Sequence, residues 1–370
     1  MRSVEPEGMI SMLRMVMPGL ALLAMLGSAA MARPFVDPRE ETNALFDTDE
    51  AVATGPRDPG CYATKLVSTG GAAPRDPGTL AVRWIGVSNF ELAYKDKVIL
   101  LDAYFDRGSA WPSLGLEAAD IRKADVILLG HAHFDHMSDA ASVGLRTGAV
   151  LVGAPITVEK LKTQAVPDTQ IRAVTGKGDE LLTFDGFTVE PILALHGTPD
   201  KHITEVMQGA LDSLTPKPTD AGKAEEKAIM DRGTFDPRVI TEGTIAYLIT
   251  FDDGFRIMYR DSGGRVTGYE TAAMQRLPGV DLALVAVSAD FLNPPTAAQA
   301  LEHARTYKPD VLMPAHHDAP VGGHVPLWRA TEPIFQALKD ANPGLVTVSR
   351  AYREPVCFDT RVNISHGRHY

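Results

Sequence analysis

The sequence predicts an α/β fold in which strands and helices form separate layers. Short apolar runs typical of strands recur along the chain, and helical patterns lie between several of them. Hydrophobic residues make up 45% and charged residues 22% of the chain, which is ordinary for a globular protein with a substantial core. Strands interleaved with helices favour layered α/β packing over an all-β sandwich.

The N-terminus has the features of an export signal. Arg14 precedes an apolar run from Met15 to Met25, and the segment closes on the small-x-small pattern Ala30-Met31-Ala32. The alternative is an uncleaved membrane anchor, which a Pro18-Gly19 pair disfavours in a stretch already near the lower length limit for spanning. We therefore expect a signal peptide at residues 1–32, a periplasmic or secreted protein, and no stable membrane insertion after cleavage.

The regular structure is expected within residues 79–358. Residues 33–78, which contain many Pro, Gly, Asp and Arg residues, are expected to form a loop-rich arm, and residues 359–370 a C-terminal tail. A turn at Lys95-Asp96-Lys97 separates the first two predicted strands, and Asp125–Leu129 is a continuous apolar run typical of a buried strand. The predicted strands are Leu80–Val87, Val98–Tyr104, Asp125–Leu129, Ala149–Val152, Phe187–Leu195, Thr244–Phe251, Phe255–Tyr259, Leu282–Val287 and Val311–Met313. Helices are expected from Ser138 or Asp139, over Thr296–Tyr307 and over Leu327–Ala341.

Residues 200–240 interrupt this order of elements. The segment contains Thr215-Pro216-Lys217-Pro218 and the charged run Lys223–Lys227, and it separates two predicted strands. We interpret it as an insertion. Two interpretations of its role stay open: a lid over the site, or a solvated surface excursion.

The chain has only two cysteines, Cys61 and Cys357. One precedes the first predicted strand and the other follows the last. In an oxidising compartment they could join the two ends of the domain, and such a long loop is where a disulfide restricts the unfolded chain most. The alternative is a pair of unrelated buried thiols. Neither cysteine has the spacing of a metal ligand.

The charge balance argues against a nucleic-acid partner. The formal net charge is -11, whereas proteins that bind phosphate backbones usually present a basic face. We expect a small-molecule substrate. The oligomeric state is left open.

A dense run of ligand-type side chains follows the buried strand at 125–129. Three imidazoles and a carboxylate occur in the run His131-Ala132-His133-Phe134-Asp135-His136. Neutral imidazole nitrogens and carboxylate oxygens are the ligands that zinc and similar divalent ions prefer. His131 and His133 can point to one side of an extended loop, while Asp135 and His136 turn to a second position. The run therefore predicts a site for two metal ions.

Further ligands are needed to complete two coordination shells, and the sequence offers three. His196, Asp261 and His316 each follow the end of a predicted strand. Ligands that emerge from the same ends of several strands can converge in space.

These residues, in this order, resemble the motif of the metallo-β-lactamase superfamily over about Leu80 to Val348. The opening strands also resemble the branch that contains ascorbate-6-phosphate lactonase-like enzymes and N-acylphosphatidylethanolamine phospholipase D. The resemblance implies a four-layer αββα sandwich. It also implies that His131, His133 and His196 hold one ion, that Asp135, His136 and His316 hold the other, and that Asp261 bridges them.

The sequence departs from some members of this superfamily. Many β-lactamases of the fold have Cys where Asp261 stands, which disfavours antibiotic hydrolysis. His133 excludes the flavodiiron pattern, which has Glu at that position. Gly130 replaces the Thr common in glyoxalase-II-like members, and Val87 follows Gly86 where the lactonase and phospholipase branch often has His.

The expected activity is hydrolysis of an ester, lactone or phosphodiester by a water whose pKa two divalent ions lower. We expect zinc, with manganese or iron as alternatives. The catalytic candidates are Asp135, which places negative charge near the ions, and His317, which could protonate the leaving group and also competes with His316 as last ligand. Asp102 is either a carboxylate that orients a ligand histidine or a strand-end cap. No role is expected for the remaining histidines, because a histidine without a motif is by default a surface residue. They are His202, His303, His324, His366 and His369.

Two other functions remain possible on the same fold. One is an iron-dependent oxidoreductase such as a sulfur dioxygenase. The other is a non-catalytic metal-binding protein, which the complete set of ligand residues disfavours.

Overall fold

The computed structural model describes residues 58–109, 114–198, 219–287, 295–318 and 332–362, apart from Pro59 and Thr64. The predicted signal peptide at 1–32 lies outside the described residues. Parts of the predicted arm, insertion and tail also lie outside them. Among the described residues, no helix combines the length and apolar character needed to cross a membrane.

Two mixed seven-stranded sheets pack face to face in the described part of the chain. The first has the order β14 (Pro355–Asp359), β1 (Thr79–Gly86), β2 (Asn89–Tyr94), β3 (Lys97–Leu101), β4 (Val126–Leu128), β5 (Val150–Gly153) and β6 (Ile171–Ala173). The second has the order β13 (Val346–Thr347), β12 (Pro309–Ala315), β11 (Val280–Ala286), β10 (Arg256–Arg260), β9 (Thr244–Phe251), β8 (Phe187–Ala194) and β7 (Leu182–Phe184). In each sheet an antiparallel part continues into parallel strands, β3 to β6 in one and β10 to β13 in the other.

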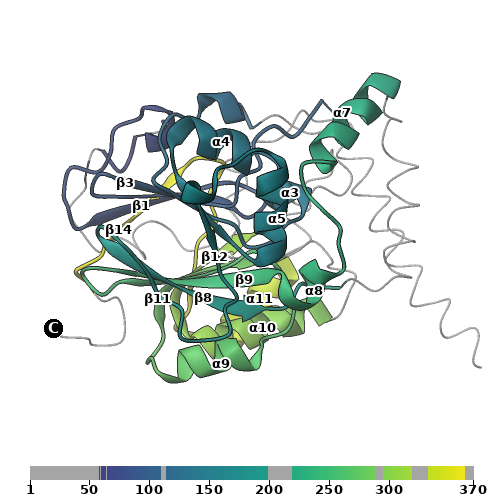
Figure 1. Cartoon of the computed structure of the whole chain (residues 1–370). Coiled ribbons are helices and arrows are strands. Elements are labelled where there is room, and N and C mark those ends of the chain that lie inside the picture. The colour runs from purple at the N-terminus through teal and green to yellow at the C-terminus, as the bar shows by residue number, and fades with distance from the viewer. Residues whose placement is uncertain are drawn as a thin grey trace, which may run out of the picture.

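Helices cover the outer faces of the two sheets, so the four-layer αββα sandwich is confirmed (Figure 1). α9 (Gly268–Gln275), α10 (Pro295–Tyr307) and α11 (Glu332–Ala341) lie on the second sheet, and α4 (Ala140–Thr147) lies on the first. The other helices are α3 (Phe134–Met137), α5 (Pro155–Thr163), α7 (Asp220–Met230) and α8 (Arg238–Glu242), with short 3-10 helices at Val67–Thr69, Ala118–Asp120 and Asp168–Gln170.

Side chains that alternate between the two faces of a strand explain why both faces of the second sheet are covered. On β9, Ile245, Tyr247 and Ile249 belong to the main core cluster, which draws residues from both sheets. The intervening Ala246 and Leu248 pack instead with residues of α9. Because successive side chains of a strand point to opposite faces, one strand contributes to two apolar layers. Strands buried on both faces require helices outside.

Several strands differ from the sequence-based prediction. The turn at residues 95–97 is present, but Asn89–Tyr94 forms a separate strand, β2, which was not predicted. β3 ends at Leu101 rather than at Tyr104 because Asp102 adopts a left-handed backbone conformation, with φ of 56°. β6, β7, β13 and β14 were also missed. Each of these strands is short and lies at the edge of a sheet. Pairing with the neighbouring strand, rather than a pattern of apolar residues, defines it.

The described part of the arm is fixed to the first sheet by a buried ion pair. Arg83 and Glu91, whose side chains are fully buried, lie 3.2 Å apart on β1 and β2. Glu91 accepts hydrogen bonds from the backbone amides of Val67 and Ser68. Arg83 donates to the carbonyl oxygen of Cys61. The ion pair is therefore satisfied by arm backbone, as a buried charge pair requires.

Cys61 and Cys357 form a disulfide, so the pairing interpretation is confirmed over that of separate thiols. The bond joins residues 296 positions apart and links the arm to β14.

Removing this disulfide should destabilise the protein by increasing the conformational freedom of the unfolded chain. We expect Cys61→Ser with Cys357→Ser to lower the free energy of unfolding by about 2–5 kcal/mol. Equilibrium urea denaturation measures the change. Reductant should destabilise the wild type by a similar amount and leave the double variant unaffected. Equal stability of oxidised wild type and double variant would contradict this prediction.

Candidate metal centre

The strand ends at one edge of the sandwich carry all the predicted ligands. His131, His133, Asp135 and His136 follow β4 in the first sheet. In the second sheet, His196 follows β8, Asp261 follows β10 and His316 follows β12. The structure brings these side chains together, as the sequence predicted, because the carboxyl ends of the four strands meet there.

The ligand atoms form two triads joined by a third group. One triad is His131, His133 and His196, and the other is Asp135, His136 and His316. Asp261 forms a group with His131 and His136, one residue from each triad. Within each group the potential ligand atoms lie within 4.8 Å of one another. This grouping is the one that the family resemblance implied.

The first triad consists of imidazoles at nearly equal spacing. Nε2 of His131 lies 3.0 Å from Nδ1 of His133. The His196 ring centroid lies 4.7 Å from that of His131 and 4.6 Å from that of His133. In the second triad, Oδ2 of Asp135 lies 3.3 Å from Nε2 of His316 and 3.5 Å from Nε2 of His136.

Asp261 lies between the two triads and is fully buried. Its Oδ2 lies 2.5 Å from Nδ1 of His131 and 3.4 Å from Nδ1 of His136. Its Oδ1 is buried without a hydrogen-bond partner in the described part of the chain. A Cβ at Gly130 would lie 2.0 Å from Oδ2 of Asp261, so only glycine lets the carboxylate approach the loop after β4.

Burial favours the neutral form of four of the five histidines of the centre. It lowers the pKa of His133 to about 2 and also lowers the pKa of His131, His136 and His196. Burial also acts on His316, but the neighbouring Asp135 outweighs it and raises the pKa of that imidazole. Burial raises the pKa of Asp135, but the neighbouring His136 and His316 outweigh this and hold the pKa well below its ordinary value. Neutral imidazoles beside an ionised carboxylate are the protonation states that bind metal.

Asp102 orients one ligand histidine, which matches the first of its two predicted roles. Its Oδ2 lies 2.6 Å from Nδ1 of His136, and its Oδ1 accepts a hydrogen bond from the Gly130 amide. The Tyr259 hydroxyl also donates to Oδ2 at 2.6 Å. A hydrogen bond at Nδ1 leaves Nε2 of His136 to face Asp135, which is the arrangement a ligand histidine needs.

Arg260 ties together the strand ends that carry His196 and Asp261. Its fully buried guanidinium pairs with Glu270 at 2.9 Å and donates to the carbonyl oxygens of Leu195 and Ser262. Neither Arg260 nor Tyr259 was predicted to have a role. The available signal was that a phenolic and a charged residue directly precede Asp261 at the end of a strand.

His303 corrects the expectation that the remaining histidines are on the surface. It is only 1% exposed, and its Nε2 contacts the carbonyl oxygen of Gly264 at 2.8 Å, in the loop after Asp261. The sequence pattern of α10 did not indicate that this face is buried. His202, His324, His366 and His369 lie outside the described residues.

The loop after β12 holds His316 in a left-handed backbone conformation, with φ of 59°. Its amide donates to the carbonyl oxygen of Val87, and the Val87 amide donates to Oδ1 of Asp318. Asp318 in turn pairs with the buried Arg107 at 3.1 Å. The loop is therefore anchored to the corner between β1 and β2.

His317 lies outside these groups of potential ligand atoms. Its ring stacks on Trp84, with centroids 4.2 Å apart, and it belongs to none of the metal-binding groups. Burial lowers its pKa to about 4, so it is neutral at pH 7. The geometry favours His316 over His317 as the last ligand. Proton donation by His317 to a leaving group stays a prediction.

The donor set fits divalent metal ions. Imidazole nitrogens and carboxylate oxygens suit zinc and related ions. Oδ1 of Asp261 and Nδ1 of His316 are buried polar atoms without a partner among the described residues, and such atoms are costly to bury. The two triads would each hold one ion, with Asp261 available to both.

Replacing Asp102 should weaken metal binding through His136. Asp102→Asn keeps the shape of the side chain but replaces the carboxyl group that fixes the His136 imidazole with an amide, so we expect about 10–100-fold lower affinity for divalent ions. Competition with a chelator of known zinc affinity measures the change. Asp96→Asn, at an exposed turn, is the matched control and should bind as wild type does. Unchanged affinity in a folded Asp102→Asn variant would refute an orienting role.

Comparisons with known proteins agree with this geometry. Residues 97–317 match the model of the beta-lactamase superfamily domain. A UPF0173 metal-dependent hydrolase of Polynucleobacter asymbioticus is 25% identical over 271 residues, covering 72% of this chain and 82% of that protein. One from Myxococcus xanthus is 24% identical over 296 residues, covering 80% and 85%. Among solved structures, Igni18, a metallo hydrolase from Ignicoccus hospitalis, shares the fold with a TM-score of 0.52 at 17% identity, covering 76% of this chain and 98% of that one. The chain belongs to the metallo-β-lactamase superfamily, as a relative of metal-dependent hydrolases.

Proposed function

We propose that this protein is an exported hydrolase that uses two divalent metal ions, most simply zinc, to cleave an ester, lactone or phosphodiester bond. The observation that carries the proposal is the pair of triads with Asp261 in reach of both. The names of the curated relatives, which are metal-dependent hydrolases, support the same reaction class.

Divalent ions held by these residues would polarise a substrate oxygen and lower the pKa of nearby water. The protein's own contribution is to hold the ligands in place and in the right protonation state. Burial keeps the three imidazoles of the first triad neutral, and Asp102 fixes the orientation of His136. Asp135 and Asp261 supply negative charge that would retain the ions.

A small-molecule substrate fits this proposal better than a nucleic acid. The net charge of -11 disfavours binding to a phosphate backbone. The assignment to the lactonase and phospholipase branch stays a prediction, as do the identity of the metal and the bond cleaved.

Removing a ligand of the first triad, or the aspartate between the two triads, should abolish metal binding and turnover. We expect His133→Ala and Asp261→Ala each to lower activity by at least about a hundredfold, because losing a ligand should cost more than losing an orienting partner. Metal analysis of the purified mature protein and a panel of phosphodiester, lactone and thioester substrates measure both effects. The wild type should contain two zinc or manganese ions per chain.

Two results would contradict the proposal. One is a single iron per chain with oxygen uptake, which indicates oxidation. The other is full activity in a metal-free double variant. Lys65→Gln, at an exposed lysine of the arm, serves as the control.

The export proposal has its own test. The disulfide between Cys61 and Cys357 supports an oxidising compartment, where such bonds persist. We expect the native host to contain the protein outside the cytoplasm with an N-terminus near residue 33. Cell fractionation and intact mass measurement check this. A full-length chain with free thiols in the cytoplasmic fraction would overturn it.

A further inference from the structure

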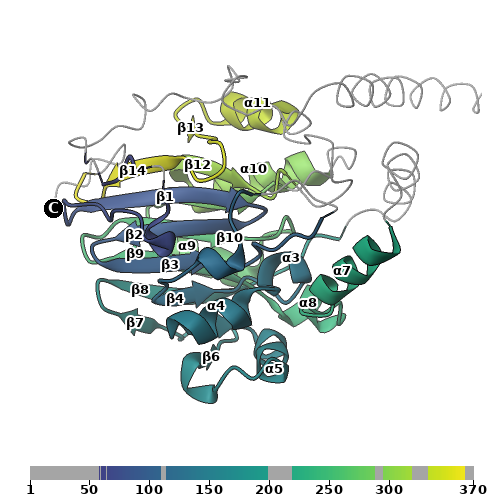
Figure 2. The ribbon, with the colours of Figure 1, turned by 90° about the horizontal axis from the view of Figure 1, so that it is seen from above.

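The described part of the insertion packs against the metal-binding loop. Ile229 of α7 is buried in a small apolar cluster with Val87 and Tyr104, against which Phe134 packs. The Glu225 carboxylate accepts hydrogen bonds from the amide and hydroxyl of Ser109. Figure 2 shows α7 beside α3 at one edge of the molecule. α7 is therefore packed in a defined position next to the metal centre.

The segment after α7 is held directly against the ligand loop. The Thr234 amide donates to the carbonyl oxygen of Ala132 at 2.8 Å. A Cβ at Gly233 would lie 2.4 Å from the Phe134 amide nitrogen, so glycine is required for this close approach. Arg232, just before it, pairs with the buried Asp139 at 3.2 Å. These contacts fix the backbone that carries the next residue, Phe235.

Phe235 presents an exposed aromatic ring beside a predicted metal ligand. Its ring centroid lies 5.2 Å from that of His133, yet the residue is 58% exposed. An isolated exposed apolar side chain is common on protein surfaces and needs no explanation. This ring differs because its backbone is anchored to the ligand loop and because it borders a pocket.

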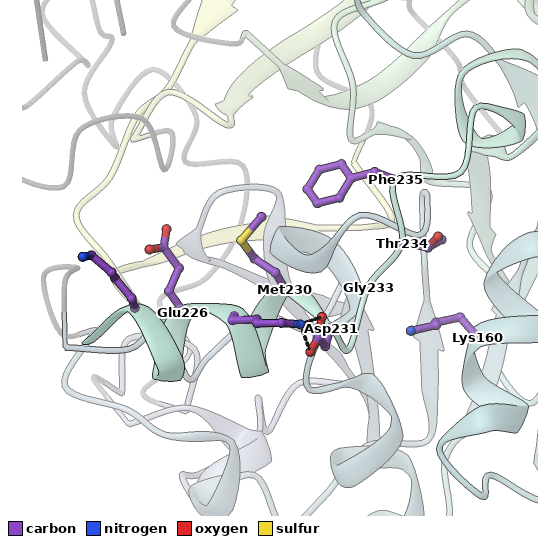
Figure 3. Close-up of a pocket in the computed structure, with 9 residues that line it drawn as sticks. Lys160, Glu226, Met230, Asp231, Gly233, Thr234 and Phe235 are labelled. Carbon is purple, nitrogen blue, oxygen red and sulfur yellow. Dashed lines mark hydrogen bonds and ion pairs between the residues drawn. The ribbon is translucent and has the colours of Figure 1, made fainter. Parts of the chain in front are cut away.

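The pocket lies between α7, the segment after it, and α5, and has a volume of about 560 Å³ (Figure 3). Small-molecule sites typically have about 300–1,000 Å³. The Met230 and Phe235 side chains give it an apolar surface, and the other lining residues are Lys160, Lys223, Glu226, Lys227, Asp231, Gly233 and Thr234. Because Phe235 contacts both the pocket and His133, the pocket adjoins the first triad.

Among the described residues, two of the charged side chains that line the pocket have no ion-pair partner, the cation Lys160 and the anion Glu226. Lys227 pairs with Asp231 at 2.6 Å, and Lys223 pairs with Asp220 at 3.4 Å. Within the described ranges, the Lys160 ammonium has no ion-pair partner. Glu226 lies at the opposite end of the pocket from Lys160 in Figure 3, so it does not neutralise that end. In a chain with a net charge of -11, this is a local site for an anion.

We propose that this pocket binds the non-reacting part of the substrate, an apolar chain or ring that carries a carboxylate. The apolar part packs on Phe235 and Met230, and the carboxylate pairs with Lys160. This inference rests on the proposed function, since it places the scissile bond at the metal centre beside His133. The inference adds a substrate class. The substrate would be an ester, lactone or phosphodiester that also carries an apolar group and a negative charge.

Equilibrium binding tests the pocket without turnover. The probes are 4-phenylbutanoate and 4-phenylbutylamine, which share the apolar part and differ in charge, and calorimetry measures their binding to the metal-loaded mature protein. The wild type should bind the acid at least about tenfold more tightly than the amine. Lys160→Gln should weaken acid binding by about tenfold and remove that preference, because a charge-assisted contact is lost. Phe235→Ala should weaken both probes by about three- to tenfold.

The controls remove a lysine or an aromatic ring elsewhere. Lys65→Gln on the arm and Tyr269→Ala, at a residue of α9 that is 42% exposed, should bind both probes as wild type does. Metal content should be the same in all four variants.

Two outcomes would overturn the proposal for this pocket. In the first, neither probe binds. In the second, the acid binds to Lys160→Gln and Phe235→Ala as tightly as to the wild type, which means that the carboxylate binds the metal ions instead. The substrate panel separates this failure from failure of the proposed function. If the protein hydrolyses a substrate but acid binding does not depend on Lys160, only the pocket proposal is wrong. If acid binding depends on Lys160 but no substrate is hydrolysed, only the hydrolase proposal is wrong.

Discussion

The site depends on a buried carboxylate held where two sheets meet. Asp261 comes from the second sheet and contacts His131 and His136, which follow β4 of the first sheet. Its approach is possible only because residue 130 is glycine. The two sheets must therefore pack with β4 and β10 ending at the same level. The four-layer architecture is what fixes that level, since the shared core between the sheets sets their relative position.

The same packing maintains three backbone conformations that are unfavourable on their own. Val87, Asp102 and His316 have φ values of 48°, 56° and 59°. Such residues cost roughly 1–3 kcal/mol each and persist where surrounding contacts determine them. Here the amide of Asp102 donates to Leu128, and that of His316 donates to Val87. The strain lies in the residues that place or orient ligands, so the rest of the fold supplies the stability that holds the centre in shape.

The sequence allowed the centre to be predicted better than its surroundings. His196, Asp261 and His316 could be grouped with the histidine run because each follows an apolar strand, and strand ends of one sheet edge meet in space. The position of Phe235 could not be predicted, because it depends on how α7 docks through Ile229 and Glu225 rather than on any local pattern. Short edge strands such as β14 were missed for a related reason: their pairing partner lies far away in the chain.

Electrostatics connects the metal centre to the stability of the fold. Asp102 and Asp261 are fully buried, and burial raises the pKa of both carboxyl groups. Ionising them is costly, because the neighbouring Arg260 and histidines offset only part of the cost of burial for Asp261, and the hydrogen bonds from Tyr259 and Gly130 offset only part of it for Asp102. A divalent cation next to Asp261 would offset that cost, so binding of metal and formation of the native centre favour one another. Asp261, whose Oδ1 has no hydrogen-bond partner among the described residues, is therefore better explained as part of a site for cations than as a structural group.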